Sequence, residues 1–110
     1  MIQDRIDKIE DRLKQSKTVK ESDKAELLTL LTTLRTEIAD LSQTHHEQAE
    51  SIAGFAELSA QEATRSAKSP ELFNLSIAGL TSSVQGFEVS HPKLVGIINT
   101  FCTMLSNLGI

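Results

Sequence analysis

The chain has 110 residues, a formal charge of −4 and a single cysteine. This length allows one domain with a modest core, and one cysteine excludes a disulfide framework. The chain is acidic, lacks Trp and Tyr, and has its four Phe at core-like positions, whereas nucleic-acid binding uses basic surface and exposed stacking rings, so we expect no nucleic-acid partner.

The first predicted helix covers about residues 2–15. Its four apolar residues are spaced 4, 3 and 4 apart and form one stripe on a charged helix: Ile2, Ile6, Ile9 and Leu13. A short polar segment follows, with two alternative caps for the next helix, Thr18 paired with Glu21 or Ser22 followed by Asp23. The short connection predicts an antiparallel hairpin.

The second predicted helix runs from about residue 23 to 67, with no internal proline. Its seam has strict heptad spacing, continues in register through His45 and Gln48, and then reaches Ile52 and Phe55. The apolar start of this seam is Leu27, Leu31, Leu34, Ile38 and Leu41. The alanines after residue 48 favour helix but bury little surface, so we expect fraying or a break between Gly54 and Lys68. Such a helix is about 65 Å long, and the first helix cannot cover it.

Ser69, Pro70 and Glu71 predict the start of a third helix. Its heptad seam keeps one register from residue 73 to 108 and includes Phe73, Ile77, Leu80, Val84, Phe87, His91, Leu94, Ile98, Phe101, Leu105 and Leu108. A turn would reset the helical phase, so the register favours one helix kinked at Pro92. The alternative is a helix over about 70–89 followed by a separate one. Gly109 and Ile110 predict a Schellman cap.

A second strip on the third helix holds small and apolar residues: Leu72, Leu75, Gly79, Ser83 and Gly86. Glycines seven residues apart leave a shallow groove where another backbone can approach closely. The alternative is that the helix merely tolerates both glycines. The segment after Lys93 carries no charge and many apolar residues, so other parts of the chain or a second copy must cover it.

Two stretches carry a resemblance to a known family. Phe87-Glu88-Val89-Ser90-His91-Pro92 with Leu94, and the terminal run from Leu105 to Ile110, resemble small bacterial helical proteins catalogued as domain of unknown function 4404. The resemblance covers most of the chain, the charged hairpin included, and its specific part is the C-terminal third. Because the family has no assigned activity, the resemblance implies a bacterial cytoplasmic helical protein and no catalytic residue.

Residues 45–50 are the one stretch that resembles a chemical site. His46 and Glu50 share a helix face at i, i+4, but the second His of a zinc-protease motif is missing, so both are weak metal-ligand candidates that we expect on solvent. His91 lacks a nearby nucleophile motif and is interpreted as a helix-start or kink residue. Cys102 lies on an apolar arc, which predicts a buried, inert thiol.

The sequence predicts an all-α fold in which a helical hairpin precedes long coiled-coil-like helices, as one domain over residues 1–110 of an oligomeric helical bundle. We expect a non-enzymatic structural or interaction module without cofactors. It should form a homo-oligomer, with a dimer favoured over a tetramer. The alternative is a metal- or small-ligand-binding protein that uses residues 45–50.

The predicted self-association residues are the seam positions of the second and third helices: Leu31, Leu34, Ile38, Leu41, His45, Phe73, Ile77, Leu80, Val84, Phe87, Leu94, Ile98, Phe101 and Leu105. No uncharged run reaches the ~20 apolar residues of a membrane span. The charges that follow Met1 leave no room for a signal peptide. We therefore expect a soluble, cytoplasmic protein without a membrane partner.

Overall fold

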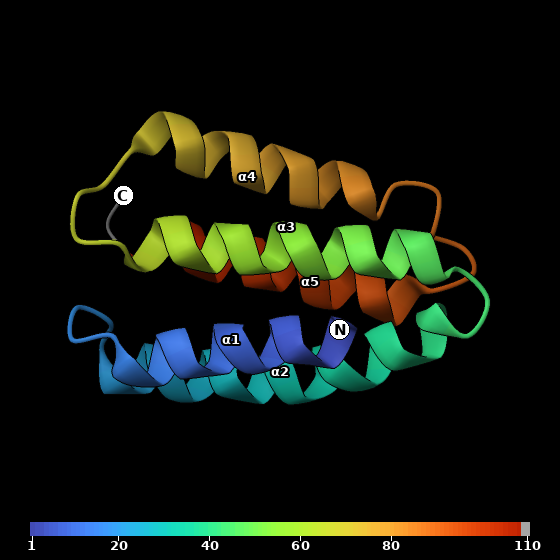
Figure 1. Ribbon diagram of the computed structural model, residues 1–110, viewed down its shortest axis with the longest axis horizontal. Helices are drawn as coiled ribbons and strands as arrows, with labels where there is room; N and C mark the ends of the chain where they lie inside the picture. Colours follow the sequence, from blue (N-terminus) through green and yellow to red (C-terminus); the bar gives the residue numbers. More distant parts are fainter. Residues whose placement is uncertain (109–110) are drawn as a thin grey trace.

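The computed structural model describes residues 1–108 and folds them into five helices. These are α1 (Ile2–Gln15), α2 (Glu21–Ser42), α3 (His46–Thr64), α4 (Pro70–Ser83) and α5 (Pro92–Ser106). Successive helices run antiparallel (Figure 1), and residues 1–108 contain no strand. The all-α prediction is confirmed.

The helices form three layers (Figure 1). α4 is one outer layer, α3 and α5 lie in the middle, and α1 and α2 form the other outer layer. α3 packs against all four other helices, whereas α4 contacts only α3 and α5 among the helices. α4 therefore has two helical neighbours, as has α1, which contacts α2 and α3.

The alanines of α3 explain how this helix contacts four neighbours. Five of them are 0 or 1% exposed: Ala49, Ala53, Ala56, Ala60 and Ala63. The prediction that these alanines bury little surface was wrong. Their small side chains let neighbouring helices approach closely, so that α3 fills the middle of the core.

The predicted long helix over residues 23–67 was also wrong, because the chain turns at Gln43, Thr44 and His45. The turn folds α3 back along α2, where the apolar side of α3 is covered by the chain itself. An unbroken helix would have left that side in water. The end of α3 at Thr64 falls in the interval where we expected a break.

The start of α4 agrees with the sequence. Ser69 Oγ accepts a hydrogen bond from the N–H of Leu72 at 3.3 Å, and Pro70 is the first helical residue. At α2 neither predicted cap is used, because the helix begins at Glu21 with Lys20 at the N-cap position. Its first turn already presents acidic side chains to the positive end of the helix dipole.

The favoured kinked helix over residues 70–108 was wrong, and the alternative of two helices was right. α4 ends at Ser83, and α5 begins at Pro92. Gly86 in the connection has φ +96°, a left-handed conformation that favours glycine. The register persists across the gap because both helices bury their own stripe in the same core. The predicted cap at Gly109 and Ile110 lies outside the described residues.

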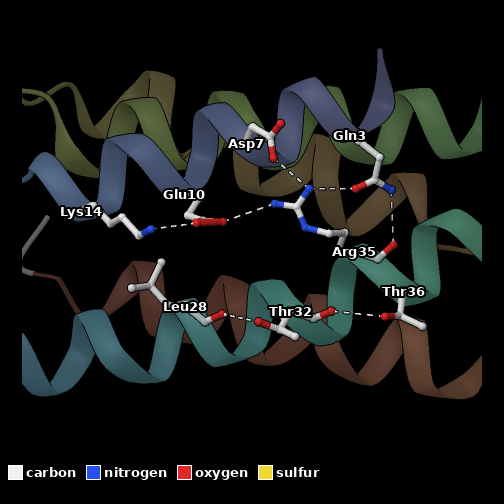
Figure 2. A network of polar contacts seen from close by, with 8 residues as sticks. All are labelled: Gln3, Asp7, Glu10, Lys14, Leu28, Thr32, Arg35 and Thr36. Carbon is white, nitrogen blue, oxygen red and sulfur yellow. Dashed lines mark hydrogen bonds and ion pairs between the residues drawn. The ribbon is translucent and has the colours of Figure 1, made fainter.

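A polar network joins α1 to α2 (Figure 2). Arg35 of α2 contacts three side chains of α1, with Nη1 at 2.9 Å from both Asp7 Oδ1 and Gln3 Oε1 and Nη2 at 3.3 Å from Glu10 Oε1. Lys14 Nζ lies 2.9 Å from Glu10 Oε2. The Lys14 ammonium, and then Arg35, hold the pKa of Glu10 below its ordinary value. The network fixes the register of the hairpin.

Candidate functional site

Most of the predicted self-association residues lie inside the single chain. Eleven of them are 0–3% exposed and belong to the core: Leu31, Leu34, Ile38, Leu41, Phe73, Leu80, Val84, Leu94, Ile98, Phe101 and Leu105. Ile77 and Phe87 are half-buried against that core, and His45 is exposed in the α2–α3 turn. The buried seam residues pack within one chain, so in this fold they offer no surface to a second copy.

Exposed apolar side chains gather elsewhere. Among residues 1–108, six large apolar side chains are exposed, and four of them belong to α3 and α4. We call these four residues the α3–α4 face: Phe55, Leu58, Leu72 and Leu75. Their exposed fractions run from 37% for Phe55 to 68% for Leu75. The other two, Met1 and Val89, lie before α1 and in the α4–α5 connection.

The ring of Phe55 joins the two helices of this face. A Cβ added to Gly79 of α4 would lie 2.4 Å from Cε1 of Phe55, so the absence of a side chain there lets the ring lie against α4. α3 and α4 run antiparallel (Figure 1), so one turn along α3 from Phe55 to Leu58 matches one turn back along α4 from Gly79 to Leu75. The apolar side chains therefore follow one strip across both helices.

The α4 part of the face is almost free of charge. Glu71 is the single charged residue between Pro70 and Ser83. Small exposed residues, Ala78 and Ser82, follow Leu75 along the outer side of α4. The outer side of α4 therefore has large side chains near the start of the helix and small ones near its end. Depletion of charge is a property of the central part of protein–protein interfaces.

The sequence indicated only part of this face. The strip with Leu72, Leu75 and Gly79 was interpreted either as a groove for another backbone or as a helix that tolerates glycine, and in the structure a side chain of the same chain, the ring of Phe55, lies against Gly79. Phe55 was assigned to the seam of a long helix, and Leu58 was missed. The break before α3 changes which residues face inward, so that the alanines of α3 take the core positions.

The three histidines lie at the end of the molecule where α2 meets α3 and α4 meets α5. The rings of His45 and His91 both contact Phe87 edge-on, with centroid distances of 5.3 and 5.7 Å, and lie 6.4 Å from each other. His91 Nε2 is 3.7 Å from Asp40 Oδ2. This cluster ties the two connections together.

His46 and Glu50 lie together as their spacing predicts. His46 Nε2 is 3.2 Å from Glu50 Oε1, and its Nδ1 is 3.1 Å from Ser42 Oγ. Both side chains face solvent. Within residues 1–108, no three His, Cys, Asp or Glu side chains gather as a metal ion requires. The arrangement therefore provides two ligands, fewer than a structural or catalytic zinc site uses.

His91 and Cys102 lie where their sequence context predicts. His91 is the N-cap residue of α5, directly before Pro92. Cys102 is buried, and burial raises the pKa of its thiol, which disfavours the reactive thiolate.

A mainly apolar groove of about 350 Å³ lies between α2 and α5. It is open to solvent, and its lining is Ala25, Glu26, Thr29, Leu30, Thr100 and Met104. A binding pocket for a small molecule usually encloses its ligand and presents several converging polar groups. This groove has one carboxylate and two threonines, whose hydroxyls donate to carbonyl oxygens of their own helices.

The sequence matches, over residues 29–110, the family described as Domain of unknown function (DUF4404). The chain belongs to this family. The DUF4404 match starts within α2, so α1, which the resemblance was expected to include, lies outside it, while the whole α3–α4 face lies inside. No curated protein and no solved structure matches the chain. Among the helices of residues 1–108, none is long and apolar enough to cross a membrane.

Proposed function

We propose that this DUF4404 protein is a non-enzymatic interaction module that binds a second copy of itself through the α3–α4 face. The observation that carries the proposal is the grouping of four large, 37–68% exposed apolar side chains on two adjacent helices. Single exposed apolar residues are ordinary, whereas a group of them points to a binding surface. The proposed contact is this face and not the buried heptad seams.

Charge favours a second copy as the partner. Two identical faces bring identical charges together, so a face with several charges would repel itself. The outer side of α4 has only Glu71, at its first turn. Two α4 helices can therefore meet through their outer sides without a like-charge contact at the centre, and on α3 the nearby Glu57 and Glu62 are paired with Arg5 and Arg65.

The order of large and small residues also suits a symmetric pair. In a two-fold interface the same patch occurs on both partners, in opposite directions. Two antiparallel α4 helices would then place Leu72 and Leu75 of one copy opposite Ala78 and Ser82 of the other. Large side chains would meet small ones, which allows close packing.

The size of the molecule is compatible with this pairing. A stable dimer takes about 800 Å² from each partner. The molecule measures 37 × 25 × 22 Å, so one whole side along its long axis has an area of that order, and the contact would extend beyond the four residues of the α3–α4 face. The interface would use most of the surface that α3 and α4 present.

Leu75→Glu tests the proposal, because it adds a charge at the most exposed residue of the face. We expect the variant to keep its helicity by circular dichroism and to weaken dimerisation at least about tenfold, since each unit of 1.4 kcal/mol in binding is tenfold in affinity. Val89→Glu is the matched control, because Val89 is 95% exposed but lies outside the face. Equal masses for Leu75→Glu and the unmodified chain in light scattering would reject the α3–α4 face.

A further inference from the structure

The turn between α2 and α3 contains no residue that by itself breaks a helix. Its residues are Gln43, Thr44 and His45, with neither glycine nor proline. Gln43 keeps helical angles, φ −67° and ψ −30°. The N–H of His45 still donates to the carbonyl oxygen of Leu41 at 2.8 Å, the i to i−4 bond of an α-helix. The change of direction is concentrated at His45, with φ −135° and ψ 63°.

Tertiary contacts add to the local hydrogen bonds of this turn, in which Thr44 Oγ1 lies 2.8 Å from His45 Nδ1 and donates to the carbonyl oxygen of Leu41. The His45 ring packs against Phe87 and His91, which belong to the distant α4–α5 connection. The heptad register also continues through the turn, from Leu41 to Ile52. A straight helix over residues 21–64 would therefore keep its apolar residues on one side.

The heptad register is also continuous across the α4–α5 connection, but this connection differs because its residues interrupt a helix. Gly86 has φ +96°, and Pro92 begins α5. Proline inside a helix removes a hydrogen bond and clashes with the preceding turn. Of these two connections, only the α2–α3 turn can become helical without placing a proline inside the resulting helix.

We propose that the α2–α3 turn is a hinge, and that its straightening lets two copies exchange their α1–α2 hairpins. The straight helix would be about 65 Å long at 1.5 Å per residue. The hairpin of one copy would then pack on α3 and α5 of the other and restore the contacts that the closed chain makes within itself. This exchange does not depend on the α3–α4 face.

His46→Pro should lock the closed form. His46 is the first residue of α3, a position that suits proline. The chain supplies a template, since His91 before Pro92 has φ −136° and ψ 60°, nearly the angles of His45. In a straight helix the same proline would be internal and would clash with the carbonyl of Ser42. We expect it to reduce the exchanged form on the order of 100-fold per hinge.

The experiment uses a Leu75→Glu background, in which the proposed face contact is disrupted. Gln43→Ala with Thr44→Ala favours the straight helix, because alanine has the highest helix propensity. Refolded at high concentration, this protein should give dimers by light scattering. Adding His46→Pro should abolish them, and His46→Ala, which also removes the imidazole, should not. A monomer before the proline is added, or dimers that persist after it, would overturn the hinge.

A cross-link identifies the exchanged form directly. Arg5 Nη1 of α1 lies 3.0 Å from Glu57 Oε1 of α3, a contact that the exchange would move between chains. With Arg5→Cys and Glu57→Cys, a short thiol cross-linker should join two chains in the dimer and act within one chain in the His46→Pro variant. Dimers with only intrachain links would also reject the exchange. Neither result bears on the face, which is judged by Leu75→Glu in the otherwise unmodified chain.

Discussion

For single residues, burial decides what a substitution does in α5. Phe101 is fully buried, whereas Thr103 is exposed on the same helix. Truncating a buried Phe typically costs about 3–5 kcal/mol of the ~5–15 kcal/mol that stabilises a small domain. An Asp at that position adds an unpaired buried charge. We expect Phe101→Asp to be largely unfolded and Thr103→Asp to melt cooperatively close to the unmodified protein in circular dichroism.

The comparison controls for the added charge and the helical context, so burial is the difference between the two variants. Similar melting curves for Phe101→Asp and Thr103→Asp would mean that α5 does not form the core.

His46 and Glu50 test the alternative of metal binding. Because they form a two-residue surface contact, we expect stoichiometric zinc to leave the melting temperature unchanged. The double variant His46→Ala, Glu50→Ala should keep its fold, since alanine favours helix. Zinc stabilisation of the unmodified protein that disappears in the double variant would establish metal binding at this pair.

For the helices, α3 depends on small side chains. Ala56 is fully buried in a helix that packs against four others. Ala56→Leu adds three carbon atoms to a filled space, and we expect it to destabilise the protein by about 1–3 kcal/mol in urea unfolding. Ala67→Leu is the control, because Ala67 is exposed just after α3. Equal stability of the two variants would contradict the close packing of α3.

Some elements follow from local sequence alone. The stripe from Ile2 to Leu13 defines α1, and Ser69 with Pro70 defines the start of α4, because spacing and caps act within a few residues. Local spacing and caps did not predict the break after Ser42. No residue between Ser42 and His46 breaks a helix, and the turn forms because α3 gains cover by folding back.

The sequence predicted only part of the α3–α4 face. Leu72 and Leu75 stand on a strip that was visible in the sequence. Because α4 contacts only two helices, its own apolar pattern decides which side faces outward. Phe55 and Leu58 could not be placed, because the outward side of α3 depends on which four helices surround it. Packing in three dimensions decided these positions.

For the whole molecule, the two breaks between helices, at the α2–α3 turn and at the α4–α5 connection, change the argument for self-association. A single long helix would have exposed its seam, but the folded chain is 37 Å long and covers its seams itself. The expected dimer therefore no longer follows from uncovered seams. For two copies of the closed chain, the dimer depends on the α3–α4 face.

The mass of the unmodified protein in solution tests this central proposal most directly. Light scattering over a concentration series should show a rise from one chain mass of 12.1 kDa toward twice that value. The exposed apolar face predicts that the rise is reversible on dilution. A mass that stays at 12.1 kDa up to the highest soluble concentration would contradict self-association through this face.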